Sequence, residues 1–292
     1  MNERKIYPWY FMVAAVLLFL MLYLVPSVMG MFYSFTDWTR YGEEIHFVGL
    51  SNFQKLFSSS ENYLSFIKNT LMFTVISTTV KTVLALALAI LFTENIKCSN
   101  FHRAVAFAPQ VLSMLVVGLV FKAMLHPSTG FINIFLESIG LGGLTHDWLG
   151  SLDTAFGTII FVDTWKGVGY GMVIFIAGLQ AIPREYYEAA EMDGAGFWAK
   201  VRNVMIPFLV PTILVNVVLS ISYGLRVFDI VYVLTNGGPG YATDVMNTVV
   251  FNEFSRGNYA MGSTVATVLA LLTMIVAFAI LKLFNKSGEE QA

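Results

Sequence analysis

The sequence predicts an all-α, polytopic membrane protein with six transmembrane helices. Hydrophobic residues make up 57% of its 292 positions and charged residues only 12%, whereas ordinary soluble domains carry about 25% charged residues. Six apolar stretches are long enough to cross a bilayer, which takes about 20 mostly apolar residues. The six stretches are 9–35, 69–92, 104–125, 155–180, 207–235 and 264–284.

The first stretch follows Arg4 and Lys5 and could pass for a secretory signal peptide. Its apolar run is longer than a typical signal core, and no small-residue cleavage site follows it. We therefore expect a retained first span. The chain then divides into a first helix with an external segment, residues 1–68, and a five-helix core, residues 69–292.

The distribution of Lys and Arg predicts the orientation, because cytoplasmic loops carry an excess of both. With the N-terminus inside, nine basic residues fall in cytoplasmic segments and three in external ones. The nine are Arg4, Lys5, Lys97, Arg103, Arg184, Lys200, Arg202, Lys282 and Lys286, and the three are Arg40, Lys55 and Arg256. Both termini and the loop 181–206 are therefore expected in the cytoplasm.

The external stretches 36–68 and 127–154 are expected to form short interfacial helices. In the second stretch, apolar residues recur at helical spacing from Phe131 to Ile139. This spacing suits a helix that lies on the membrane surface.

The cytoplasmic loop predicts a helix–turn–helix outside the bilayer. Pro183 suits the first turn of a helix that runs from Arg184 to Asp193. Gly194 follows at the position of a left-handed C-terminal cap. A second short helix, residues 197–205, is expected before Pro207 opens the fifth span. By themselves these features fit equally well an amphipathic loop that only connects two spans.

A motif in this loop favours a more specific reading. The loop contains Glu188-Ala189-Ala190, then Gly194 after three residues, then Val204-x-Ile206-Pro207 after nine more. This pattern resembles the EAA loop of binding-protein-dependent ABC importer permeases, EAA-x3-G-x9-I-x-L-P. Val204 and Ile206 stand in place of Ile and Leu. The resemblance implies the type I ABC importer (MetI-like) permease fold, with the loop docked in a groove of a separate ATPase. The coupling residues that it suggests are Glu188, Ala189, Ala190, Asp193, Gly194, Phe197 and Pro207.

A second motif narrows the class of importer. The segment FDIVYVLTNGGPG, residues 228–240, is similar to the end of the equivalent span in carbohydrate-importer permeases of the maltose MalF type, here in a compact six-span form. Residues 47–53 and 101–109 resemble the same family. The resemblance implies a bacterial or archaeal cell-membrane permease that translocates a sugar or oligosaccharide. Its implied partners are a second homologous permease, an ATPase dimer and an extracytoplasmic solute-binding protein.

The chain itself is expected to carry no cofactor, metal or catalytic residue. The sequence has no G-x-x-x-x-G-K-[ST] phosphate-binding loop, so ATP and Mg²⁺ would be bound by the partner ATPase. The four histidines are scattered without metal-ligand spacing. A net charge of −2 gives no basic surface for a nucleic acid.

Charged residues inside the spans allow two interpretations. Lys81, Asp163, Lys166, Arg226 and Asp229 fall within or near the apolar stretches, where charges pair with each other or line a polar cavity. Asp163 and Lys166 are three residues apart, as are Arg226 and Asp229, so each pair can share a helix face. In the first interpretation these charges form intrahelical or interhelical ion pairs that hold the bundle together.

In the other interpretation these positions form a solute path, in which aromatic faces stack on sugar rings and polar groups bind hydroxyls. This path would consist of Trp165, Lys166, Tyr170, Arg226, Phe228 and Asp229. The excess of positive charge also allows an anionic cargo, such as a uronate oligosaccharide or a glycerol phosphate.

Two other functions are weighed against the importer permease. An ion-coupled secondary transporter usually has more spans and often inverted repeats. A membrane enzyme needs a convergent acid–base or metal constellation. The sequence shows neither feature, so we expect a transport subunit and no enzyme.

Overall fold

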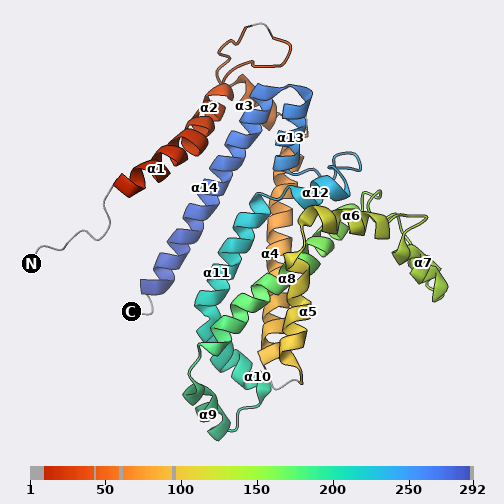
Figure 1. The fold of residues 1–292 in the computed structure, drawn as a ribbon, viewed down its shortest axis with the longest axis vertical. Helices are drawn as coiled ribbons and strands as arrows, with labels where there is room; N and C mark the ends of the chain where they lie inside the picture. The colour runs from red at the N-terminus through yellow and green to blue at the C-terminus, as the bar shows by residue number, and fades with distance from the viewer. Residues whose placement is uncertain (1–9, 43, 59–61, 94–96, 290–292) are drawn as a thin grey trace, which may run out of the picture. The chain divides into compact units, whose positions relative to one another are not determined.

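The computed structural model describes residues 10–42, 44–58, 62–93 and 97–289. Within these residues the secondary structure is helical, apart from turns and one isolated bridge between Thr36 and Phe47 (Figure 1). Five helical runs are long and apolar enough to cross a membrane: Met12–Tyr33, Tyr63–Thr93, Ala155–Gln180, Phe197–Leu225 and Tyr259–Ile280. The bent pair α5 (Ser99–Val111) and α6 (Met114–Met124) supplies a sixth crossing if it counts as one span. The predicted all-helical membrane fold is confirmed. Arg4 and Lys5, on which part of the orientation depends, lie outside the described residues.

The chain divides into two compact units. One contains Met1–Leu64 and Val249–Leu272, and the other contains Ser65–Thr248 and Thr273–Ala292. The sequence-based division at residue 68 stays a prediction.

The first unit ties the N-terminal span to the segment that follows it in the chain. Its helices are α1 (Tyr10–Phe19), the π-helical turn η1 (Leu20–Leu24), α2 (Val25–Tyr33), α3 (Ser51–Phe57), the end of α13 (Met246–Arg256) and the start of α14 (Tyr259–Glu289). The carbonyl of Ser34 accepts hydrogen bonds from Asn52 Nδ2 (3.0 Å) and Thr264 Oγ1 (3.1 Å). These two bonds fix the end of α2 against α3 and α14.

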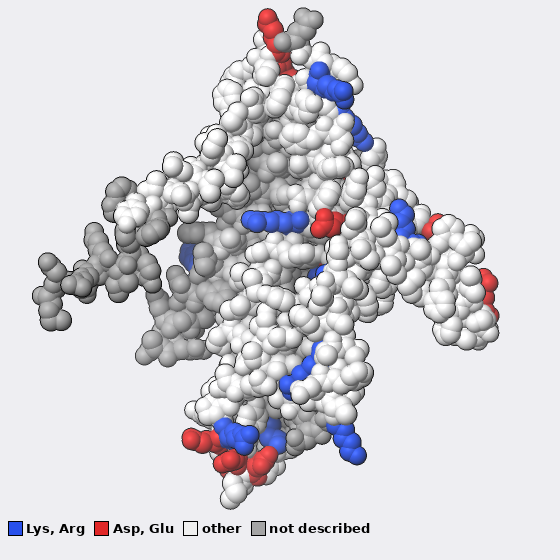
Figure 2. All heavy atoms as spheres, in the orientation of Figure 1, with Lys and Arg blue, Asp and Glu red and all other residues white. Residues whose placement is uncertain are grey.

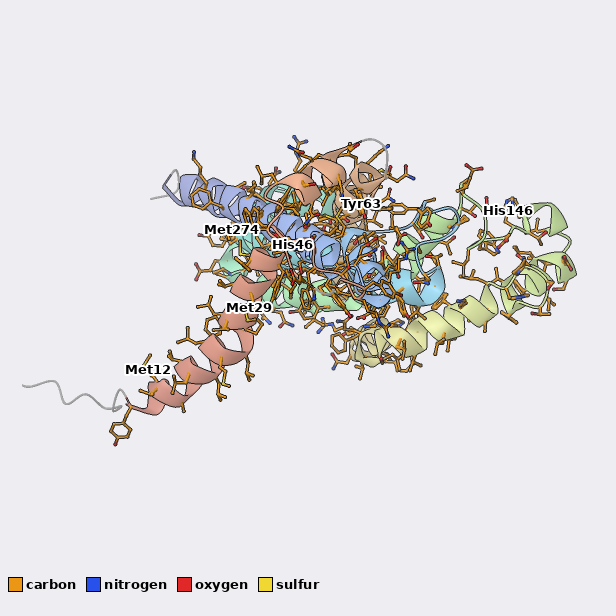
Figure 3. The ribbon with its side chains drawn as sticks, turned by 90° about the horizontal axis from the view of Figure 1, so that it is seen from above. Met12, Met29, His46, Tyr63, His146 and Met274 are labelled. Atoms are coloured by element: carbon orange, nitrogen blue, oxygen red, sulfur yellow. The ribbon has the colours of Figure 1, made fainter. Side chains whose placement is uncertain are left out.

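The first span carries apolar side chains on all sides. Met12 and Met29, labelled in Figure 3, project from it and are 66% and 48% exposed. An apolar helix of this kind is stable in lipid and would be costly in water.

The second unit is organised around α8 (Ala155–Gln180). This helix packs against α5 and against α11 (Ile206–Leu225). In Figure 1 it runs among α4 (Tyr63–Thr93), α5 and α11. The unit also contains α6, α7 (Phe131–Ser138), α9 (Arg184–Met192), α10 (Phe197–Lys200), α12 (Asp229–Leu234) and the C-terminal part of α14.

Three glycines in α8 allow this close packing. A Cβ atom at Gly169 would run into the backbone of α5 at Ala106. A Cβ at Gly167 would lie 3.1 Å from Lys81 Cε, and one at Gly171 would lie 2.9 Å from Ala85 Cβ. Small residues let membrane helices approach each other, so the glycine-rich run 167–171 is a packing device.

The expected straight span 104–125 is bent. α5 ends at Val111, Leu112 and Ser113 are extended, and α6 leaves at an angle of 95° to α5. Pro109 in the last turn of α5 and Ser113, a favoured helix-capping residue, mark this break locally. Hydropathy measures how apolar a segment is. It carries no information on whether the helix is straight, so it does not predict the bend.

The expected span 207–235 is shifted and interrupted. The helical run begins at Phe197, passes through the π-helical turn η4 (Val201–Met205) and continues as α11 to Leu225. Pro207 lies in the first turn of α11, directly after the π turn, where its missing N–H is accommodated. The predicted second helix of the cytoplasmic loop is therefore the start of the span. The chain then breaks at residues 226–228 before α12.

The expected external helices are present as α3 and α7. The rings of Phe131 and Phe135 on α7 stack at 5.9 Å and are exposed. Asn133 on the opposite side holds the following loop, because its Nδ2 donates to the carbonyl of His146, a residue labelled in Figure 3. Its Oδ1 accepts from Trp148 Nε1 (2.8 Å).

Candidate functional site

A cavity of about 190 Å³ with several polar side chains in its wall, here called the mid-span pocket, lies among the helices of the second unit. Its wall is formed by residues of α4, α8 and α11 and by residues on both sides of the break between α5 and α6. They are Lys81, Gln110, Met114, Asp163, Lys166, Gly167, Tyr170, Leu219, Ser220 and Tyr223. Polar groups that converge in this way inside an apolar bundle are typical of a ligand site.

A buried ion pair joins α4 to α8 at this pocket. Lys81 Nζ lies 2.5 Å from Asp163 Oδ2, and the Asp163 side chain is 1% exposed. Ser77 Oγ and Tyr223 OH also donate to the carboxylate, at 3.1 and 2.9 Å. The Lys81 ammonium lies 4.6 Å from the centre of the Tyr223 ring, within the range of a cation–π interaction.

Of the two forms that an ion pair of Asp163 could take, the structure shows the interhelical one, with Lys81 and not with Lys166. Lys166 Nζ donates to the backbone carbonyl of Gln110 at 3.3 Å. Gln110 lies in the last turn of α5, where carbonyl groups lack helical partners and attract cations. Two residues three apart on α8 thus bind to different helices, because each side chain reaches the nearest group of opposite polarity.

The predicted cytoplasmic loop forms a capped helix and turn. Gly194 has φ +72°, which confirms the expected left-handed cap. Ala195 N donates to Ala190 O (2.9 Å) and Gly194 N donates to Glu191 O (3.0 Å), the bonding pattern of a Schellman motif. Lys200 Nζ then bridges back to Glu191 Oε1 at 3.0 Å. The turn between α9 and α10 is therefore fixed by main-chain and side-chain bonds.

The loop presents one exposed surface and packs its other side on the core. Glu188 and Ala189 are exposed, whereas Ala190 is half-buried and packs with Tyr187 against the core cluster of α4, α8 and α11. Met192 and Trp198 are 89% and 78% exposed. Figure 2 shows acidic and basic side chains gathered over the end of the unit that holds α9 and α10.

The other predicted coupling residues belong to the same element. Asp193 is the exposed C-cap residue of α9, and Phe197, which is 40% exposed, begins α10. Pro207 is exposed at the start of α11. Of the seven positions, Ala190 is the one that the structure turns toward the chain's own core.

Comparison with known proteins identifies the family. Residues 81–287 match the family described as "Binding-protein-dependent transport system inner membrane component". The chain belongs to this family. The "Probable ABC transporter permease protein YurN" of Bacillus subtilis is 36% identical over 99% of both chains. The "Trehalose/maltose transport system permease protein MalF" of Thermococcus litoralis is 32% identical over 94% of this chain and 92% of its own.

A solved structure shares the fold of this permease. It is a chain in the crystal structure of a bacterial alginate ABC transporter in complex with an alginate pentasaccharide-bound periplasmic protein. The TM-score is 0.81 with 24% sequence identity, and the match covers 93% of this permease and 91% of that chain.

The permease brings together only part of the predicted solute path. Lys166 and Tyr170 line the mid-span pocket. Trp165 packs against Phe121 at 5.1 Å. The remaining three path residues, Arg226, Phe228 and Asp229, lie at the break between α11 and α12.

The possible ion pair between Arg226 and Asp229 is absent. Arg226 and Asp229, both within the described residues, are exposed and do not pair with each other. The carbonyl of Arg226 accepts from Asn247 Nδ2 (2.8 Å), and the Phe228 ring stacks on Tyr232. The end of α11 removes the helical spacing that would have placed Arg226 and Asp229 on one face.

Sequence reasoning missed Gln110, Ser220 and Tyr223 as pocket residues. Tyr223 carries a detectable signal, because it is a polar aromatic residue within an apolar span. Gln110 reaches the pocket only because α5 ends just after it. Ser220 does not stand out in the sequence, because serine is common in membrane-spanning helices.

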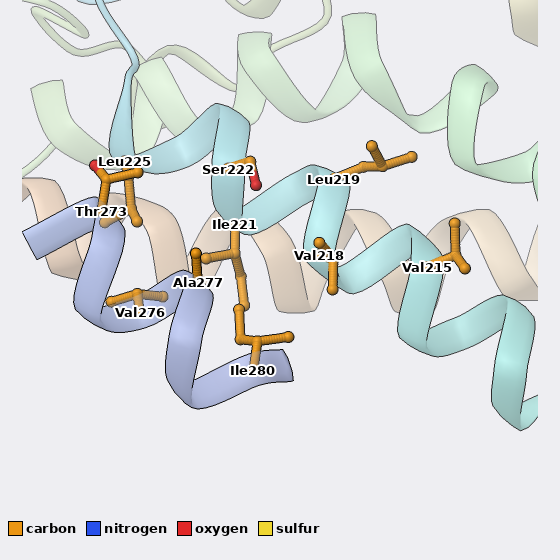
Figure 4. Close-up of a pocket in the computed structure, with 10 residues that line it drawn as sticks. All are labelled: Val215, Val218, Leu219, Ile221, Ser222, Leu225, Thr273, Val276, Ala277 and Ile280. Atoms are coloured by element: carbon orange, nitrogen blue, oxygen red, sulfur yellow. The ribbon is translucent and has the colours of Figure 1, made fainter. Parts of the chain in front are cut away.

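A second cavity, of about 390 Å³, lies in the same unit between α11 and the C-terminal half of α14 (Figure 4). Its lining is aliphatic except for the hydroxyls of Ser222 and Thr273. Such a wall offers little that would orient a hydroxylated solute, so the mid-span pocket is the better candidate for a solute site.

Proposed function

We propose that this chain is the membrane-spanning permease subunit of an ATP-driven importer. In this proposal it translocates a sugar or oligosaccharide that an extracytoplasmic solute-binding protein delivers. The observation that carries the proposal is the capped α9–α10 turn at the EAA motif, exposed in a helical membrane protein of the binding-protein-dependent family. The name of the trehalose/maltose relative supports the carbohydrate cargo.

The partners follow from the same proposal. A second, homologous permease closes a central path, and two ATPase subunits bind ATP–Mg²⁺ and receive the α9–α10 turn. The alginate transporter, solved with its periplasmic protein, supports the external partner. Closure of the ATPases would bias the permeases between inward-facing and outward-facing states. This chain performs no covalent step.

In the same proposal, the mid-span pocket contacts the solute during this cycle. Tyr170 presents an aromatic face, and Ser220 and Gln110 carry groups that can exchange hydrogen bonds with hydroxyls. The ion-coupled transporter and the membrane enzyme gain no comparable support. No group of three or more potential metal ligands occurs among the described residues.

Purification of the tagged chain from its source membrane tests the proposal. We expect an ATP-hydrolysing subunit and a second permease to purify with it. Ala189→Asp, at an exposed position, should weaken ATPase binding while leaving the melting temperature of the isolated chain unchanged. Ala190→Asp is the matched comparison and should lower that melting temperature, because it places a charge against the core. Purification of the wild-type chain without any ATPase, while cells still take up the solute, would refute the proposal.

The cargo is identified through the binding protein. A ligand that binds only the folded state raises its melting temperature. We expect a sugar or oligosaccharide to produce the largest rise, and the same sugar to accumulate in cells only when this permease is present.

A further inference from the structure

The mid-span pocket holds an imbalance of charge. Among the residues that line it, two are basic, Lys81 and Lys166, and one is acidic, Asp163. Lys81 and Lys166 are each only 8% exposed. A buried charge inside a membrane protein is expected to be paired or to take part in function. If both lysines are paired with acidic groups, the pocket has only a structural role. An unpaired lysine would instead be available to a ligand.

Asp163 neutralises Lys81 and has little capacity left. Its Oδ2 accepts from Lys81 Nζ and Ser77 Oγ, and its Oδ1 accepts from Tyr223 OH. These three donors come from α4 and α11 and occupy both carboxylate oxygens. The pair is thus a closed unit that fixes three helices.

Among the described residues, no carboxylate lies within ion-pairing distance of Lys166. Its Nζ donates a hydrogen bond to the carbonyl of Gln110 at 3.3 Å. A carbonyl at a helix C-terminus stabilises a cation through its dipole but does not cancel a full charge. An ammonium group has three N–H donors, so two remain for other acceptors at the edge of the cavity.

We propose that the mid-span pocket binds an anionic group of the transported solute, with Lys166 as its counter-ion. The solute is a sugar unit that carries a carboxylate or a phosphate. Its oxyanion pairs with Lys166 Nζ, while the hydroxyl groups of Tyr170 and Ser220 face its remaining polar groups. The inference rests on the proposed function and defines the chemical class of its cargo.

The size of the cavity sets how much of the solute it holds. Its 190 Å³ is below the roughly 300–1,000 Å³ of usual ligand pockets. The cavity therefore has room for about one acidic sugar unit and not for a longer chain.

Thermal unfolding of the purified permease complex, without its binding protein, tests the proposal. The probes are glucuronate, glucose 6-phosphate and glucose, titrated at constant ionic strength. We expect one or both anionic sugars to raise the melting temperature more than glucose does. The comparison of glucuronate with glucose 6-phosphate distinguishes a carboxylate from a phosphate.

Substitutions assign the effect to Lys166. In Lys166→Met the apparent Kd for the preferred anionic sugar should rise about tenfold or more, because a charge-assisted hydrogen bond is lost. Lys166→Arg should keep the preference. Lys122→Met is the matched control, since Lys122 is an exposed lysine on α6 outside the pocket lining. If Lys166→Met does not fold, Lys166→Gln removes the charge and keeps a donor for the Gln110 carbonyl.

Two results would overturn the inference. One is an equal response of the wild-type complex to glucose and to both anionic sugars. The other is an anion preference that survives in Lys166→Met or Lys166→Gln, which would leave Lys166 as a cap on α5 and no more. Either result leaves the sugar-importer function intact, because that function depends on purification with the ATPase.

Discussion

Asp163 on α8 binds Lys81 on α4, at 2.5 Å, and not Lys166 in the next turn of its own helix. The contact joins segments 82 residues apart in the sequence, counted from 81 to 163. Each of these charges would be costly in lipid by itself, and their pairing links α4 to α8.

This pair predicts a clear difference between single and double variants. Removal of one partner, as in Lys81→Met or Asp163→Asn, should destabilise the protein by about 3–5 kcal/mol, because it leaves a buried charge unpaired or a site half-satisfied. The double variant Lys81→Met/Asp163→Leu should regain most of this loss. Melting temperatures of the detergent-solubilised chain measure both. Equal destabilisation in the single and double variants would contradict the pairing.

The turn between α9 and α10 provides a matched pair of glycines. Both Gly194 and Gly196 have open space around an added Cβ, but only Gly194 has a positive φ. Gly194→Val should therefore cost at least about 1–2 kcal/mol of local stability in the turn and reduce ATP-driven uptake, while membrane insertion stays normal. Gly196→Val should transport as the wild type does. Similar uptake by both variants would show that the left-handed cap is not needed for coupling.

Packing of α8 against α5 predicts a second glycine comparison. Gly169→Ala should destabilise the chain by about 1–3 kcal/mol, because the new methyl group overpacks the contact with the α5 backbone at Ala106. Gly157→Ala on the same helix meets nothing within 4 Å and should be neutral or stabilising. Thermal unfolding of the two variants side by side decides between overpacking and helix propensity.

Cys98, the single cysteine of the chain, tests the proposed orientation. It is exposed in the turn before α5, and the distribution of basic residues predicts that this turn lies in the cytoplasm. A membrane-impermeant maleimide should label it in inverted vesicles and leave it unlabelled in intact cells. The control, Ser128→Cys in a Cys98→Ser background, lies in the 127–154 loop and should show the opposite pattern. Labelling of Cys98 in intact cells would reverse the topology.

Much of this protein was determined by its sequence alone. Apolar length gives the spans, because a helix must satisfy its backbone hydrogen bonds within the bilayer wherever it crosses. Local chemistry gives the cap at Gly194, since few other residues adopt its backbone conformation. The EAA spacing identifies the family that the comparisons then confirm. Each of these features depends on residues that are near one another in the chain.

Only the tertiary structure decided where the spans bend and which charges meet. The break at Leu112 frees the Gln110 carbonyl for Lys166, and the end of α11 at Leu225 separates Arg226 and Asp229 from the mid-span pocket. The partner of Asp163 follows from the closeness of α4 and α8, which glycines in α8 allow. Helical spacing in the sequence predicts which residues can lie on the same face of a helix. Which of them form contacts depends on the neighbouring helix, and that neighbour is distant in the sequence.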